Sequence, residues 1–195
     1  MKRRHLEILI MGSLALLVTA LINAHSVVSL IMFGVLFTLV HHRLFREESP
    51  ASAIGVFSAY ALFAVLLYLA QLWAIPSYNG FTGPEGGIGT DDAYFYSLVA
   101  RDLPDDFPIR PGRYLPRHNY TDILKIVAVP IYAVFGRLHL LDLVFFNLMG
   151  LSLIPFFTVG IAQRLKLDDG AIRVVFWTTL LCPFLLANGL ILVRD

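Results

Sequence analysis

Five long apolar runs are the feature that most constrains how this 195-residue chain can fold. A helix that crosses a bilayer needs about 20 predominantly apolar residues. Charged residues make up only 15% of the chain, against about 25% in soluble domains, so lipid is the expected solvent for this surface. The expected fold class is therefore an all-α polytopic membrane protein with about five transmembrane helices. Those runs are Leu6–Ile22, Ser26–Val40, Ala53–Ile75, Leu140–Ala162 and Ala171–Val193.

The first two runs predict a tight helical hairpin, because only Asn23, Ala24 and His25 separate them. No small-x-small cleavage site follows the first run, which indicates a retained anchor rather than a signal peptide. We divide the chain into residues 1–52, a transmembrane hairpin with a cytoplasmic basic turn, and residues 53–195, a membrane core with an external loop over residues 76–122.

The placement of Lys and Arg predicts the orientation, since cytoplasmic loops carry the excess of these residues. Lys2, Arg3 and Arg4 put the N-terminus in the cytoplasm, so after three crossings the loop Pro76–Asp122 lies outside. Ile123–Phe135 is too short to span and contains Pro130, so we expect it to lie along the membrane. The expected location is the plasma (inner) membrane, with several spans and a cytoplasmic N-terminus.

The external loop contains an acidic pair, Asp91 and Asp92, which follows a plausible N-cap at Thr90. One interpretation is a solvated helix start, where carboxylates favour the positive end of the helix dipole. The other is chemical: one carboxylate is a general base, or both bind a divalent metal such as Mg²⁺ or Mn²⁺. A second pair, Asp105 and Asp106, lies between prolines and predicts a turn.

A basic stretch follows in the same loop, with Arg110, Arg113, Arg117 and His118. Arginine binds phosphate through two parallel hydrogen bonds, so these residues could hold a lipid phosphate; contact with headgroups is the equally weighted alternative. No stretch is basic enough to follow a nucleic-acid backbone, so nucleic acid is excluded as a partner. The single cysteine, Cys182, lies in an apolar run and predicts a packing role.

The order of these features resembles the N-terminal part of the GT-C membrane glycosyltransferases, in particular the dolichyl-mannosyltransferase and aminoarabinose-transferase type. The likeness runs from Ala53 to Asp195 and includes Asp91-Asp92-x-Tyr94, the Pro/Arg-rich stretch and the closing Arg194-Asp195. It implies an external loop carrying two interfacial helices, and a sugar donor linked to polyprenyl phosphate. Asp91 and Asp92 match the acidic motif, Tyr94 and Tyr96 match the start of the first interfacial helix, and Asp195 matches an acidic residue at the outer end of a later span.

The sequence also departs from that family. The hairpin Leu6–Val40 precedes the usual first span, His118-Asn119-Tyr120 replaces a frequent Lys-Pro-Pro run, and the family has many more spans. We therefore expect a transferase that acts on a cell-surface glycan or lipid, or the N-terminal portion of one, which is either a truncated gene product or a chain completed by another membrane polypeptide. The alternatives are an exopolysaccharide repeat-unit polymerase and a non-catalytic transport or assembly subunit.

Overall fold

The computed structural model describes residues 2–45, 50–74, 130–136 and 138–182. Helices and turns account for these residues, and no strand occurs among them. Four stretches of the described chain are long and apolar enough to cross a membrane: His5–Ile22, Ser26–Leu44, Ala51–Ala70 and Leu141–Arg164. The predicted all-helical membrane class is confirmed to this extent. The helices are α1 (Lys2–Ile22), α2 (Ser26–Leu44), α3 (Pro50–Ala74), α6 (Leu140–Leu151), α7 (Ile154–Arg164) and α8 (Asp169–Leu180).

The predicted hairpin of the first two spans is confirmed by the turn between α1 and α2. Asn23 donates its backbone N–H to the Thr19 carbonyl at 2.8 Å, and its side-chain oxygen accepts the His25 N–H at 3.0 Å. An asparagine side chain that bonds two residues ahead closes a turn in place of the helix ladder. Three residues are therefore enough to reverse the chain.

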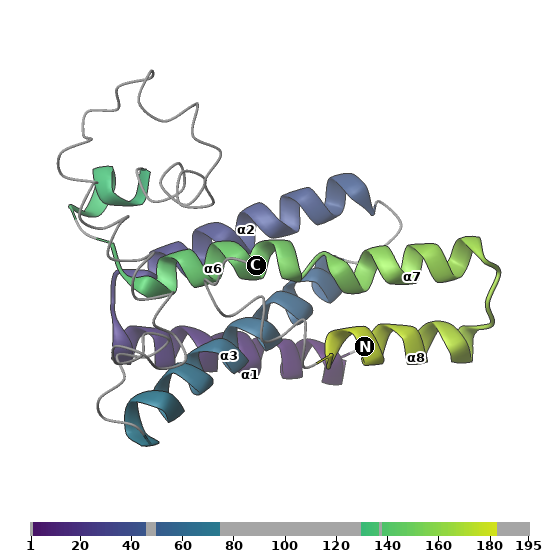
Figure 1. The fold of residues 1–195 in the computed structure, drawn as a ribbon, viewed down its shortest axis with the longest axis horizontal. Coiled ribbons are helices and arrows are strands. Elements are labelled where there is room, and N and C mark those ends of the chain that lie inside the picture. Colours follow the sequence, from purple (N-terminus) through teal and green to yellow (C-terminus); the bar gives the residue numbers. More distant parts are fainter. Residues whose placement is uncertain (1, 46–49, 75–129, 137, 183–195) are drawn as a thin grey trace, which may run out of the picture.

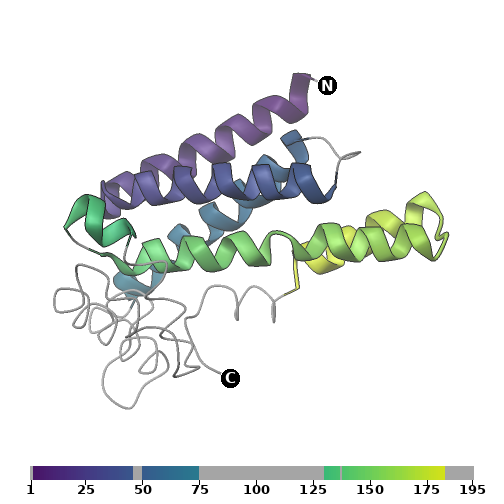
Figure 2. The same cartoon turned by 90° about the horizontal axis from the view of Figure 1, so that it is seen from above.

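Helices α1 and α2 pack against α3, which crosses beneath them (Figures 1 and 2). Small residues allow close approach: a Cβ atom added at Gly55 would lie 3.2 Å from Ile8 Cγ1. Such small-residue contacts are the usual way that membrane helices pack. Large apolar side chains on the other faces, such as Leu9 and Leu21, are exposed, as expected for a surface that contacts lipid.

An aromatic stripe along α2 joins it to α6 and α7. The stripe repeats every four residues, which places its members on one helix face. Phe33 packs 5.8 Å from Phe146, and Phe37 lies 6.5 Å from Phe156. Farther along, His41 lies 4.3 Å from the ring of Phe156, and Phe45 lies 5.2 Å from Phe157. These rings hold α2 along the length of the fourth span.

The fourth predicted span, Leu140–Ala162, is confirmed as a stretch that is long and apolar enough to cross a membrane, and the structure adds that its helix is interrupted. Helix α6 ends at Leu151 and α7 begins at Ile154 (Figure 1). Pro155 has no N–H to continue the ladder, and its ring crowds the carbonyl four residues earlier. The Ser152 hydroxyl donates to the Leu148 carbonyl at 2.6 Å, a contact that bends helices.

Helix α8 runs back antiparallel to α7, and this hairpin extends past the end of α2 (Figures 1 and 2). The Tyr60 hydroxyl on α3 donates to the Leu180 carbonyl at 3.1 Å, so the end of α8 is fixed to the bundle. Ala171, the first residue of the predicted fifth span, lies in α8, which is 12 residues long, so the span stays a prediction. Its residues after Cys182 lie outside the described part of the chain.

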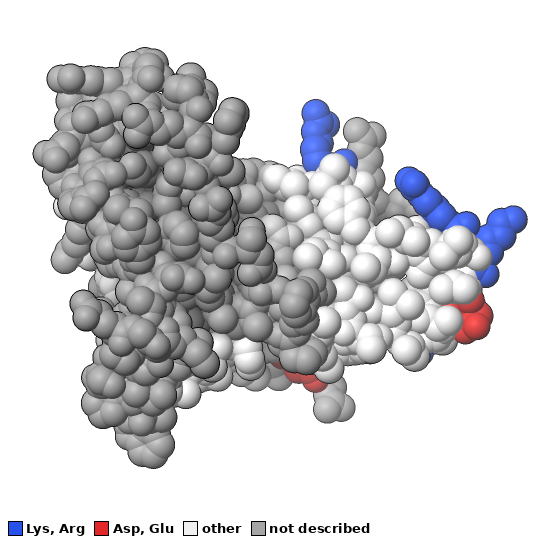
Figure 3. Space-filling model, in the orientation of Figure 1, with Lys and Arg blue, Asp and Glu red and all other residues white. Residues whose placement is uncertain are grey.

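The bundle has two chemically different ends. The basic end contains the helix positions of every Lys and Arg among the described residues, and the Lys and Arg side chains that Figure 3 draws in blue lie on one side of the molecule. The loop end contains the 23–25 turn, the last turn of α3 and the start of α6 (Figure 1). The cations of the basic end are Lys2, Arg3, Arg4, Arg43, Arg164, Lys166 and Arg173.

Candidate functional site

The residues that the sequence singles out for chemistry all lie outside the described residues. This holds for the predicted bases and metal ligands and for the predicted phosphate-binding residues, so their geometry stays a prediction. The structure does describe α3 and α6, the helices on either side of the loop that contains all of these residues except Asp195. Those residues are Asp91, Asp92, Tyr94, Tyr96, Arg110, Arg113, Arg117, His118 and Asp195.

Both attachment points of that segment lie at the loop end. The ring of Tyr68, near the end of α3, lies 6.0 Å from the ring of His139, which precedes α6. The chain therefore leaves the bundle and returns to it at the same end. The described residues that flank the loop on both sides therefore lie at the end of the bundle opposite the described lysines and arginines.

A reciprocal cap fixes the start of α6. The Leu141 N–H donates to His139 Nδ1 at 3.2 Å, while the His139 N–H donates to Asp142 Oδ2 at 2.8 Å. Because Nδ1 accepts a hydrogen bond, the ring proton is assigned to Nε2. Burial lowers the pKa of His139 below its usual range and outweighs the opposing effect of the Asp142 carboxylate, so the ring is neutral at pH 7.

Asp142 retains one unused acceptor. Its side chain is buried, and Oδ1 has no hydrogen-bond partner while Oδ2 caps the helix. A carboxylate at the positive end of a helix is favoured by the dipole, which offsets part of the burial cost. The His-x-x-Asp spacing before an apolar run is the signal in the sequence that could have predicted this cap.

The described end of the predicted interfacial segment packs at the loop end as well. Residues 130–135 form a short helix in which Ile131 is buried. The ring of Phe135 lies 5.7 Å from that of His25 in the α1–α2 turn. Residues 123–129 lie outside the described residues, so the orientation of the whole segment relative to the bilayer stays a prediction.

The interior of the described bundle holds little polar chemistry. Thr19, Thr38 and Ser152 donate their hydroxyls to carbonyls of their own helices, at 2.7, 2.8 and 2.6 Å. His41 is fully buried between phenylalanine rings, and neither ring nitrogen has a hydrogen-bond partner among the residues that the structure describes. No group of three or more His, Cys, Asp or Glu side chains that could hold a metal occurs among the described residues.

His41 is the residue that sequence reasoning most clearly missed. Phe33, Phe37, His41 and Phe45 recur at intervals of four, which places a histidine within an aromatic face. An unpartnered buried polar group costs about 1–3 kcal/mol, so its presence is a reason to look for a ligand nearby.

Comparison with protein families, with curated proteins and with solved structures gives no match for this chain.

Proposed function

We propose that this protein is a membrane glycosyltransferase that moves a sugar from a polyprenyl-phosphate carrier to a glycan or lipid at the outer face of the plasma membrane. One observation carries the proposal. The segment with Asp91 and Asp92 is joined at both sides to the loop end, where Tyr68 and His139 meet, while the described cations occupy the opposite end. Under the positive-inside rule the loop end is extracytoplasmic and the N-terminus is cytoplasmic.

The proposed reaction uses residues of the external loop. Asp91 or Asp92 removes the proton of an acceptor hydroxyl, and that oxygen forms a bond to the anomeric carbon of the donor sugar. The bond from this carbon to the phosphate oxygen breaks, polyprenyl phosphate leaves, and the configuration is inverted. Positive charge from Arg110, Arg113 or Arg117 offsets the charge on the leaving phosphate.

The roles of the remaining loop residues follow from the family resemblance. Tyr94, Tyr96 and His118 would contact the substrates, and Asp195 would add a carboxylate at the same face. In an alternative arrangement Asp91 and Asp92 bind Mg²⁺ or Mn²⁺, and the metal then stabilises the phosphate. An exopolysaccharide polymerase would use the same face and similar residues, and it remains the neighbouring candidate.

The polar content of the described bundle favours surface chemistry over transport. Transport proteins place ionisable groups in their spans, along the path of the substrate. Of the buried Asp and His side chains in the described spans, Asp142 caps α6 and His41 is enclosed by aromatic rings. Because both side chains make contacts within and between the helices, they give the non-catalytic transport alternative little support.

The experiment compares Asp→Asn variants at the two acidic pairs. Asp91→Asn, Asp92→Asn and the double variant are produced in cell membranes and assayed with a pool of polyprenyl-phosphate sugars. Loss of a general base lowers the rate by about 10² to 10⁴-fold, while the amount of protein should stay unchanged. Asp105→Asn and Asp106→Asn are the matched controls and should transfer normally. Full activity of the Asp91/Asp92 double variant would remove this pair from the chemistry.

A further inference from the structure

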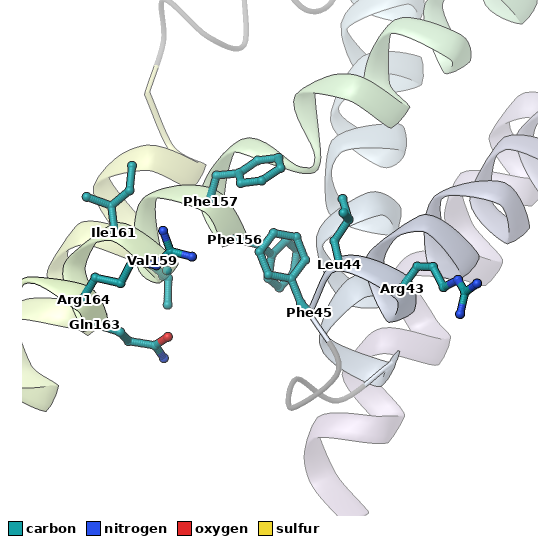
Figure 4. Close-up of a pocket in the computed structure, with 10 residues that line it drawn as sticks. Arg43, Leu44, Phe45, Phe156, Phe157, Val159, Ile161, Gln163 and Arg164 are labelled. Atoms are coloured by element: carbon teal, nitrogen blue, oxygen red, sulfur yellow. The ribbon is translucent and has the colours of Figure 1, made fainter.

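An open groove lies at the basic end, between the last turn of α2 and helix α7. Its volume is about 1020 Å³, and α2 contributes Arg43, Leu44 and Phe45 to its lining. The facing wall comes from α7, with Phe156, Phe157, Ile161 and Arg164 among its residues (Figure 4). The two walls meet where Phe45 packs against Phe156, with ring centroids 5.8 Å apart.

The groove combines an apolar floor with a cationic rim. Phe156 is almost fully buried at the floor, whereas Phe157 and Ile161 are about half exposed along α7, at 48% and 58%. Arg164 extends along α7 toward Val159, and Arg43 stands at the outer rim with its guanidinium turned away from Phe45 (Figure 4). No carboxylate is among the described residues that line this groove.

The position of the groove puts its apolar floor and its cationic rim near the membrane surface. Arg43 lies in the last turn of α2, where a spanning helix of 19 residues ends. Beyond this level α7 continues to Arg164 at the tip of the hairpin. Arg43 and Arg164 each lie at the end of a candidate span, where headgroups are expected, with Arg164 farther out than Arg43, and the phenylalanine floor lies on the bilayer side of Arg164.

We propose that this groove binds an anionic phospholipid of the leaflet at the basic end. The lipid phosphate pairs with Arg164, which can donate two parallel hydrogen bonds, and Arg43 adds charge from the opposite wall after a change of rotamer. An acyl chain lies against Phe157 and Ile161. Basic pockets between membrane helices bind such headgroups, and the combination of positive charge and exposed apolar surface fits a lipid.

Buried His41 supplies a second, independent observation. The rings of Phe45 and Phe156 pack against the His41 imidazole, with centroids 5.2 and 4.3 Å away, and both residues line the groove. Neither imidazole nitrogen has a hydrogen-bond partner within the described part of the chain. The unused hydrogen-bonding groups of His41 therefore lie next to two phenylalanines that line the groove. The lipid site is separate from the loop end and does not depend on the glycosyltransferase proposal.

The test measures lipid binding to the whole purified protein in neutral detergent by native mass spectrometry. Phosphatidylglycerol and phosphatidylcholine with identical acyl chains are titrated separately. We expect the anionic lipid to bind at least about tenfold more tightly, and Arg164→Gln to remove most of this preference. Arg43→Gln should have a smaller effect because its guanidinium is turned away, and Arg164→Lys should lie between Arg164→Gln and the unaltered protein.

Arg173→Gln is the matched control, because Arg173 is exposed at the same end on α8 and does not line the groove. It should leave the preference unchanged. Circular dichroism of each variant verifies that the helices are retained. The proposal is overturned if phosphatidylcholine binds equally well, if the Arg43/Arg164 double variant keeps the preference, or if Arg173→Gln weakens binding as much as Arg164→Gln. Equal competition by glycerol phosphate, or a dimer that excludes lipid, would likewise refute a lipid site.

Discussion

Lys166 occupies a backbone position that a side chain normally disfavours. It follows α7 with φ at +57°, the only non-glycine residue of the described chain in this region. Two hydrogen bonds hold it there: the Lys166 N–H donates to the Gln163 carbonyl at 2.9 Å, and the Leu167 N–H donates to the Ala162 carbonyl at 3.2 Å. This is the Schellman pattern that closes many helices, usually with glycine at the left-handed position.

Replacing Lys166 by glycine should therefore stabilise the protein. A left-handed conformation costs a residue with a Cβ atom about 1–2 kcal/mol, and part of that gain is lost to the greater freedom of glycine in the unfolded chain. We expect Lys166→Gly to raise the free energy of unfolding in mixed micelles by about 1 kcal/mol. Lys166→Ala removes the same charge but keeps the Cβ atom. An equal gain in both variants would attribute the effect to charge and contradict this explanation.

At the scale of elements, α8 depends on one long-range hydrogen bond to the bundle. The buried Tyr60 hydroxyl of α3 meets the Leu180 carbonyl where α8 ends. The last carbonyls of a helix have no partners within it, so a donor from another helix satisfies one of them. This contact links the α7–α8 hairpin to α3 across 120 residues of sequence.

Tyr60→Phe removes that hydroxyl and keeps the ring. Hydrogen bonds between membrane helices contribute about 0.6 kcal/mol on average, so the free energy of unfolding should fall by about 0.6–1 kcal/mol. Hydrogen exchange should also become faster near Leu180 before it changes in α1. Tyr132→Phe, on the short helix 130–135, serves as the comparison. Unchanged exchange near Leu180 would show that other contacts hold α8.

The elements themselves differ in how well the sequence predicted them. The α1–α2 hairpin was predictable because the Asn23–His25 turn divides two apolar runs. The interruption before Ile154 was not predicted, since mean hydropathy does not register the missing N–H of Pro155 or the hydroxyl of Ser152. The aromatic stripe of α2 was missed because its period-four spacing matters only once a partner helix faces it. Asp91 and Asp92 stay untested predictions.

At the scale of the whole molecule, the lysines and arginines among the described residues lie at one end of the bundle. The start of α1, the end of α2 and the α7–α8 turn carry lysines or arginines, and all lie at the basic end. The described chain has none at the loop end, where Tyr68 and His139 mark the two attachments of the intervening segment. If the basic end is cytoplasmic, the acidic pair of the loop is extracytoplasmic, as the proposed reaction requires.

Labelling of single cysteines in intact cells tests this orientation most directly. Cys182 is first replaced by alanine, and a cysteine is then introduced either at Thr82 in the loop or at Lys166 in the α7–α8 turn. An impermeant maleimide should label Thr82→Cys in intact cells and Lys166→Cys only after lysis, because the positive-inside rule places the two on opposite faces. Labelling of Lys166→Cys in intact cells, with Thr82→Cys protected until lysis, would invert the protein and contradict the proposed site of sugar transfer.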